Sequence, residues 1–178
     1  GLQLVMPGQT ALPGAGNYPS GGITGFVSTP TAGVLFTPTI NLVDQFMNVY
    51  TAVDAKVYLR TSDAFDTEPA TAALVSGSLP VALTLVTKTT GAVVSAHLCN
   101  EGNTLFCPSD GSPTNVCSGN VAPNTCRVQA GASAPFKVYA AAARKLQVLL
   151  PGEQPDPGSL LGKKNSPTPF TITAPTPN

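Results

Sequence analysis

The residues best suited to chemistry lie close together: the four cysteines, Cys99, Cys107, Cys117 and Cys126, follow the single histidine, His97. An even number of cysteines in a Gly-, Pro- and Asn-rich stretch is typical of disulfides formed in an oxidising compartment. A zinc site is the alternative, but zinc ligands usually pair as C-x₂₋₄-C, and here seven to nine residues separate neighbouring cysteines. We therefore expect two disulfides.

Three connectivities remain open for four cysteines. Sequential pairing, Cys99 with Cys107 and Cys117 with Cys126, would close two small loops. Nested pairing, Cys99 with Cys126 and Cys107 with Cys117, would clamp the base of the stretch. We favour the sequential pairing.

Catalytic and metal-binding constellations are poorly supported. A Ser/His/Asp group would need His97, and the sequence contains no Gly-x-Ser-x-Gly elbow. Asp63, Asp66 and Glu68 place three carboxylates within six residues, and Ca²⁺ takes oxygen ligands from such loops. No EF-hand pattern frames them, so we interpret them as a solvated turn between strands. We expect neither an enzyme nor a cofactor.

The sequence repeats itself at a distance. Leu2-Gln-Leu-Val-Met-Pro-Gly8 returns as Leu146-Gln-Val-Leu-Leu-Pro-Gly152, and the match extends without a gap to Gly14 and Gly158, at an offset of 144 residues (146 minus 2). A fixed-period match indicates a repeat architecture. We expect residues 1–144 to form one complete repeat and residues 145–178 to begin a second.

The composition narrows the class of protein. Only 10% of the 178 residues are charged, with nine basic and nine acidic side chains. Zero net charge argues against nucleic acid and anionic membranes as partners. No apolar run reaches the roughly 18 residues of a membrane span. No signal peptide opens the chain at Gly1, so we expect a mature or excised segment.

The remaining pattern predicts an all-β protein. The 17 Gly and 18 Pro interrupt helices and leave short apolar runs. The predicted strands cover residues 2–6, 23–28, 34–43, 57–61, 72–75, 79–87, 92–98 and 136–139. Residues 7–22 should form a linker or surface loop, 99–126 a disulfide-stapled insertion, and 140–145 an extended connection. Such a series is typical of an immunoglobulin-like β-sandwich of about seven strands.

Several segments resemble one known family. Asn41-Leu-Val-Asp-Gln-Phe-Met-Asn48 is similar to the VDxxxN turn of tandem immunoglobulin-like repeats in large bacterial surface and secreted proteins. Residues 146–153 resemble the stretch that opens each such repeat, and 61–63, 73–77 and 81–85 resemble its middle. The resemblance implies an extracellular β-sandwich with a structural or adhesive role and no catalytic residues. It ends at 99–126 and again after 158.

The last predicted strand has no domain behind it. Phe170, Ile172 and Ala174 alternate with threonines, and by the 144-residue offset Phe170 falls on Phe26. One amphipathic strand cannot bury its apolar face alone, so it needs a host sheet. Donor-strand addition to the next molecule would supply one, and such head-to-tail contacts generate open filaments.

We therefore expect an extracellular homopolymer, joined through a donor strand (Phe170, Ile172 and Ala174) and a repeat connector formed by Leu146, Val148, Leu150, Pro151 and Gly152. Two other readings of residues 145–178 stay open: they could be the cut edge of a tandem array, or they could fold back on their own domain. The alternative function is an adhesive or ligand-binding module of a long surface protein. Contact with a glycan or another surface is left open.

Overall fold

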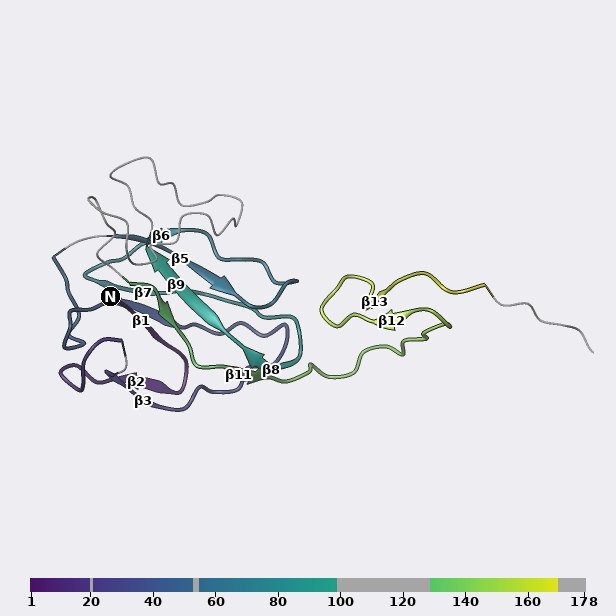
Figure 1. Cartoon of the computed structure of the whole chain (residues 1–178), viewed down its shortest axis with the longest axis horizontal. Helices are drawn as coiled ribbons and strands as arrows, with labels where there is room; N and C mark the ends of the chain where they lie inside the picture. Colours follow the sequence, from purple (N-terminus) through teal and green to yellow (C-terminus); the bar gives the residue numbers. More distant parts are fainter. Residues whose placement is uncertain (20, 53–54, 99–128, 170–178) are drawn as a thin grey trace, which may run out of the picture.

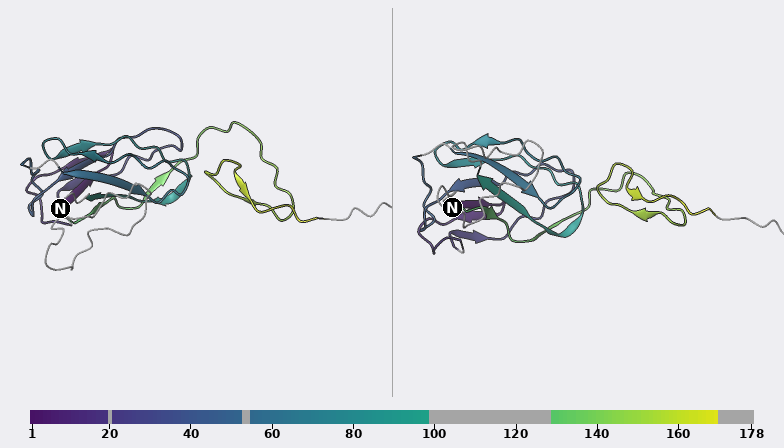
Figure 2. Two further views of the ribbon diagram at one scale, coloured as in Figure 1. Left: turned by 90° about the horizontal axis from the view of Figure 1, so that it is seen from above. Right: turned by 45° about the horizontal axis from the view of Figure 1, so that its top comes forward.

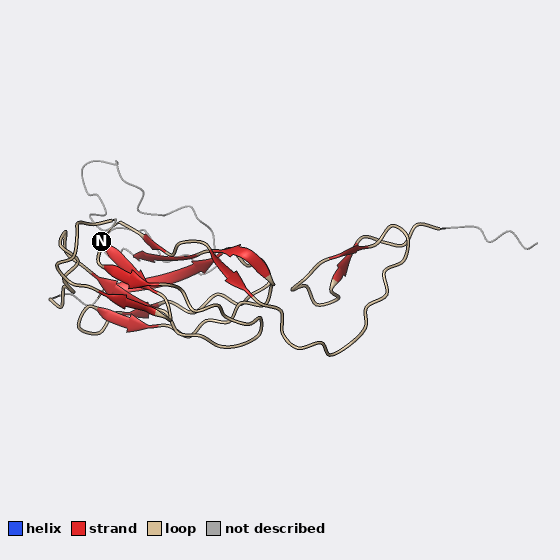
Figure 3. Ribbon diagram, turned by 90° about the horizontal axis from the view of Figure 1, so that it is seen from below, coloured by secondary structure: helices blue, strands red, loops and turns tan. Residues whose placement is uncertain are grey.

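The computed structural model describes residues 1–19, 21–52, 55–98 and 129–169. Every regular element within these residues is a β-strand (Figure 3). The predicted all-β class is therefore confirmed. The described part of the chain has no helix that is long and apolar enough to cross a membrane. The four cysteines, Phe170, Ile172 and Ala174 lie outside the described residues.

Thirteen strands are described. They are β1 (Leu2–Val5), β2 (Gln9–Ala11), β3 (Ile23–Gly25), β4 (Thr39–Leu42), β5 (Lys56–Thr61), β6 (Ala72–Ala73), β7 (Ser78–Pro80), β8 (Thr89–Ala92), β9 (Val94–Leu98), β10 (Gly131–Ala132), β11 (Phe136–Val138), β12 (Gln154–Pro155) and β13 (Lys163–Lys164).

The strands form small antiparallel sheets, an arrangement consistent with a β-sandwich. One sheet has the order β1-β4-β7 and another the order β10-β9-β5-β6, while β11 pairs with β8, β2 with β3, and β12 with β13. The longest pairing joins β5 to β9, from Val57 opposite Leu98 to Thr61 opposite Val94. Strand β1 pairs with β4 alone in its sheet and is therefore an edge strand.

The hydrophobic core lies between these sheets. Its members include Leu2, Leu4 and Met6 of the first segment, together with Ile40, Leu42, Val57, Leu59, Leu74, Leu83, Leu85, Ala92, Val94, Ala96, Phe136 and Val138. The expected apolar face of residues 79–87 is present, since Leu83 and Leu85 are buried and Leu79 and Val81 pack against the core.

The predicted strands are shorter in the structure, chiefly at prolines. Of residues 34–43 only Thr39–Leu42 is a strand, because Pro38 lacks an amide donor. Beyond β7, which ends at Pro80, residues 79–87 hold only an isolated bridge from Leu83 to Phe36. The expectation of a plain loop over 7–22 was wrong, because β2 lies inside it and pairs with β3.

The chain divides into a body and a smaller unit beside it (Figure 1). The described part of residues 1–139 forms the body, and residues 146–168, here called the tail unit, hold β12 and β13. The tail unit stands at the end of the body opposite residue 1, and two further views show the same separation (Figure 2). Residues 140–145 form an extended connection without a helical turn, as predicted.

Candidate assembly interface

The tail unit reproduces the hydrogen bonds of residues 2–28, here called the head unit. In the head unit the Gln9 amide donates to the Met6 carbonyl at 2.9 Å, and the Met6 amide donates to Gln9 Oε1 at 3.0 Å. In the tail unit the Glu153 amide donates to the Leu150 carbonyl at 2.9 Å, and the Leu150 amide donates to Glu153 Oε2 at 2.9 Å. Both pairs of residues are separated by the same 144 positions.

The Pro-Gly turn of each unit requires glycine for two reasons. Gly8 and Gly152 have φ of +87° and +91°, which side chains disfavour. A Cβ on Gly8 would also lie 2.9 Å from the Ser28 amide nitrogen, and one on Gly152 would lie 2.8 Å from that of Thr168. The Ser28 amide donates to the Pro7 carbonyl at 2.6 Å, and the Thr168 amide donates to the Pro151 carbonyl at 2.7 Å. The turn and its contact are thus repeated together.

The loop after the turn is also repeated, in a shorter form. The Leu12 amide donates to the Gly22 carbonyl at 2.7 Å, and the Asp156 amide donates to the Gly162 carbonyl at 2.7 Å. Gly22 and Gly162 share left-handed φ values of +76° and +72°. The offset is 144 at the start of the loop (156 minus 12) and 140 at its end (162 minus 22), so the tail loop is four residues shorter.

The shortened loop corrects one prediction. Strand pairing sets Thr10 opposite Thr24 in the head unit and Gln154 opposite Lys164 in the tail unit, which keeps the offset of 140 beyond the loop. Extending that offset places Ser166 rather than Phe170 on Phe26. The ungapped register assumed from the sequence therefore fails after Gly158. The donor strand itself, Phe170, Ile172 and Ala174, lies outside the described residues.

The units differ in what covers their first segment. In the head unit that segment is β1, buried against the core. In the tail unit the matching side chains face solvent. The exposed fractions are 98%, 72% and 45% for Leu146, Val148 and Leu150, against 1%, 3% and 1% for Leu2, Leu4 and Met6. Residues 146–150 form no strand, because the partner that β1 finds in β4 has no counterpart beside the tail unit among the described residues.

A buried polar side chain follows the same pattern. Gln3 Nε2 donates to the Gly22 carbonyl at 2.8 Å, and Gln3 Oε1 accepts from Asn41 Nδ2 at 3.2 Å. Gln147 reaches the same turn but a different carbonyl, with Nε2 3.5 Å from the carbonyl oxygen of Leu161, the residue before the Gly162 that matches Gly22. The tail unit thus carries the glutamine that binds β4 in the body, but not β4.

Two adjacent lysines, Lys163 and Lys164, are part of the tail hairpin. Lys163 in β13 forms an ion pair with Glu153 at 2.7 Å, and Lys164 lies 4.0 Å from Asp156. The hydrogen bond from the Leu150 amide, followed by the Lys163 contact, lowers the pKa of Glu153 below its ordinary value. The pairing of β12 with β13 brings the lysines close to these carboxylates. Two adjacent lysines in the sequence gave no indication of these contacts.

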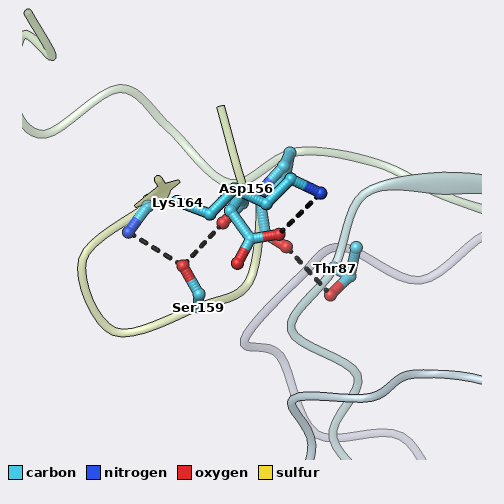
Figure 4. Close-up of polar contacts among 6 residues, drawn as sticks. Thr87, Asp156, Ser159 and Lys164 are labelled. Atoms are coloured by element: carbon cyan, nitrogen blue, oxygen red, sulfur yellow. Dashed lines mark hydrogen bonds and ion pairs between the residues drawn. The ribbon is translucent and has the colours of Figure 1, made fainter. Parts of the chain in front are cut away.

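The tail unit meets the body at one loop (Figure 4). The Thr87 hydroxyl lies 3.5 Å from the Pro157 carbonyl oxygen, the long limit of a hydrogen bond. A Cβ on Gly158 would overlap the Thr87 hydroxyl and lie 2.8 Å from Phe65 Cδ2. This close approach requires glycine at 158.

Asp63 fixes the body's side of that contact. Its carboxylate accepts bonds from the Thr87 hydroxyl at 2.6 Å and from the amides of Val86, Thr87 and Phe65 at 2.7, 2.8 and 3.1 Å. Burial raises the pKa of Asp63, but these bonds outweigh it and hold the pKa below the ordinary value. We call Asp63, Phe65 and Thr87 the shelf. The turn predicted here between strands is present, and the hydrogen bonds of Asp63 organise it.

The neighbouring carboxylates behave differently. Burial, partly offset by hydrogen bonds from Thr61, raises the pKa of both Asp66 and Glu68. No group of three or more His, Cys, Asp or Glu side chains in the described residues could hold a metal ion.

The Asp44–Asn48 segment forms the turn that the sequence predicted. Asp44 Oδ1 accepts from the Phe46 and Asn48 amides at 2.8 and 2.9 Å, and Oδ2 accepts from Asn48 Nδ2 at 3.0 Å. This turn also holds the head loop, which joins β2 to β3, because the Phe46 carbonyl accepts a hydrogen bond from the Gly14 amide at 2.8 Å.

Asp44→Ala is therefore expected to loosen the head loop as well as the turn. Without the carboxylate, the Phe46 carbonyl loses its fixed position below Gly14. Amide hydrogen exchange at 12–18 should quicken, while exchange in β5 stays unchanged. Unchanged protection at 12–18 in the variant would refute this coupling.

His97 is a strand residue, as the sequence interpretation held. It lies in β9, half-buried, with its ring stacked on Tyr58 at 5.0 Å between centroids and Nε2 2.9 Å from Ser95 Oγ. Burial, and then the charge of Arg60, lowers the pKa of His97. Val57, Tyr58 and Leu59 of β5 are all buried, so both faces of this part of the strand are covered.

The geometry thus points to one candidate surface, the exposed first segment of the tail unit together with its contact on the shelf. Comparisons of the chain with protein-family models, with curated proteins and with solved structures return no match.

Proposed function

We propose that this chain is a structural immunoglobulin-like repeat protein, a subunit of an extracellular bacterial filament or surface fibre that assembles head to tail through residues 145–178. One observation carries the proposal: the tail unit has the hydrogen bonds of the head unit, yet Leu146, Val148 and Leu150 are exposed where the head unit is buried. The side chains of this segment match core residues of the head unit, yet no core of the described residues covers them.

The hydrophobic effect supplies the driving force. Fully burying one Leu, Val or Met side chain contributes roughly 1.5–3 kcal/mol. The tail unit exposes three such side chains, those of Leu146, Val148 and Leu150. The host that fits them is a surface like the one beneath β1, where the edge of β4 pairs with β1 and Asn41 binds a glutamine. In a second copy of the chain the edge of β4 is already paired with that copy's own β1, so the tail segment must add at another sheet edge of that copy.

The shape of the molecule suits linear growth. Residue 1 and the tail unit lie at opposite ends of the body (Figure 1). A contact between unlike ends does not close on itself unless the copies rotate into a ring, and otherwise extends as a filament. The zero net charge of the chain leaves little electrostatic repulsion to oppose association.

Negative-stain electron microscopy and sedimentation velocity on the unreduced full chain test the proposal. We expect concentration-dependent fibres from the native chain and monomers from Val148→Asp, because a carboxylate cannot enter an apolar host. Val75→Asp is the matched control, since Val75 is 71% exposed and Val148 72%. Fibres from Val148→Asp, or a native chain that stays monomeric at all concentrations, would contradict the proposal.

A further inference from the structure

The loop at the free end of the body is a second copy of the loop that already touches the shelf. We propose that residues 12–15 dock on the shelf (Asp63, Phe65 and Thr87) of a copy of this repeat joined directly before them, so that consecutive repeats meet in one fixed orientation. This inference rests on the proposed function as an immunoglobulin-like repeat protein and names the two surfaces that meet between repeats.

The first observation is the contact that the chain makes with itself. Gly158 is half-buried because Thr87 and Phe65 approach it closely, and its lack of a side chain allows that approach. The Thr87 hydroxyl proton is directed to Asp63 at 2.6 Å, so the longer contact to the Pro157 carbonyl adds little. Shape, more than hydrogen bonding, defines the fit.

The second observation is that residues 12–15 of the head loop have the same form as residues 156–159 and no partner on that side among the described residues. Gly14 and Gly158 have φ of +76° and +90°. The Ala15 amide donates to the Leu12 carbonyl at 3.2 Å, as the Ser159 amide does to that of Asp156. Pro13 and Gly14 are exposed, and a Cβ on Gly14 would meet nothing within 4 Å. The surface that the tail loop covers on Gly158 is free on Gly14.

Both halves of the joint are held in place before they meet. Four hydrogen bonds to Asp63 fix the shelf, and the hydrogen bond from Gly14 to the Phe46 carbonyl fixes the head loop. A hollow of about 300 Å³ opens beside the shelf, lined by Phe65, Leu85 and Thr87 among others. A preorganised pair loses less conformational entropy on contact.

The two surfaces lie at opposite ends of the body. The loop between β2 and β3 is at the end near residue 1, and the shelf faces the tail unit at the other end (Figures 1 and 4). Successive copies can therefore repeat the same contact along one line.

A tandem chain tests the joint, because the shelf of an isolated chain already holds its own Pro157 and Gly158. Residues 1–144 are placed before the full 1–178 sequence, so that Gly1 takes the position of Lys145. Phe65 is replaced by the photo-crosslinker p-benzoylphenylalanine in one copy at a time. The second copy's shelf, against its own tail loop, is the internal positive control.

With the photo-crosslinker at position 65 of the first copy, we expect a crosslink to residues 12–15 of the second copy. With the photo-crosslinker at position 65 of the second copy, we expect a crosslink to residues 156–159 of that same copy. Gly14→Val in the second copy should abolish the first crosslink, since the new side chain collides with Thr87. Gly33→Val is the matched control, because Gly33 has φ of +77° and equally open space around its Cβ but lies outside the joint.

Crosslinking at 156–159 without crosslinking at 12–15 would overturn the inference, as would equal losses from Gly14→Val and Gly33→Val. The readout lies within one polypeptide and does not require fibres. Fibres of the native chain without a crosslink to residues 12–15 would support the proposed assembly and reject the joint. A crosslink to residues 12–15 without fibres would support the joint and reject the proposed assembly.

Discussion

Leu4→Asp is expected to lower the free energy of unfolding of the body by roughly 4 kcal/mol or more, the range of buried unpaired charges. Leu4 is 3% exposed in β1 and belongs to the core that β4, β5 and β9 share. The matching change in the tail unit, Val148→Asp, should alter that free energy by no more than about 0.5 kcal/mol, as for other exposed positions. Leu4 and Val148 occupy the same place in the two units, but only Leu4 is buried against a core.

Urea unfolding of dilute monomer, followed by tyrosine fluorescence and circular dichroism, measures both variants. Dilution matters because association would add the stability of the interface to that of the body. Similar losses in Leu4→Asp and Val148→Asp would show that the tail unit already packs on its own body, and the exposure difference between the units would then lose its meaning.

Asp63→Asn is expected to destabilise the body by about 1–2 kcal/mol at pH 7, because the amide keeps one acceptor oxygen while charge-assisted bonds are lost and solvent screens the rest. The native pKa of Asp63 lies below its ordinary value of 3.8. A carboxyl with a lowered folded pKa stabilises the fold above its unfolded pKa, and this stabilisation is lost as the pH falls through the folded value.

The difference between native chain and Asp63→Asn should therefore be constant from pH 7 to about 5 and shrink below the ordinary pKa. Thermal unfolding across that range measures it. Asp66 and Glu68 have raised pKa values and act in the opposite direction, and the charge of Asp63 is one cause of the raised pKa of Asp66, so the variant also relieves part of that shift. A difference that grows on acidification would contradict the assigned role of the carboxylate.

The sequence predicted the elements that local chemistry specifies. Alternation gave β5 and β9, the apolar face with Leu83 and Leu85 gave part of the core, and Asp44 with Asn48 gave the turn. The repeated Leu-Gln-x-x-x-Pro-Gly segment pointed to the tail unit. Each of these patterns depends on near neighbours in the chain.

Features set by distant contacts were missed. Residues 146–150 repeat the sequence pattern of β1 but have no β4 to pair with, so they form no strand. The four-residue shortening before Gly162 is visible only once Gly22 and Gly162 are matched by their hydrogen bonds. The shelf unites Asp63 and Thr87, 24 positions apart, with a loop near residue 158, and no spacing in the sequence signals that contact.

The central claim is that residues 146–150 become a paired strand once a second copy provides the host. Amide hydrogen exchange, read by mass spectrometry on the full chain across a series of protein concentrations, tests it most directly. We expect residues 2–5 to be protected at every concentration, and residues 146–150 to exchange freely in dilute monomer and become protected as fibres form. Fibres in which residues 146–150 still exchange freely would contradict the account.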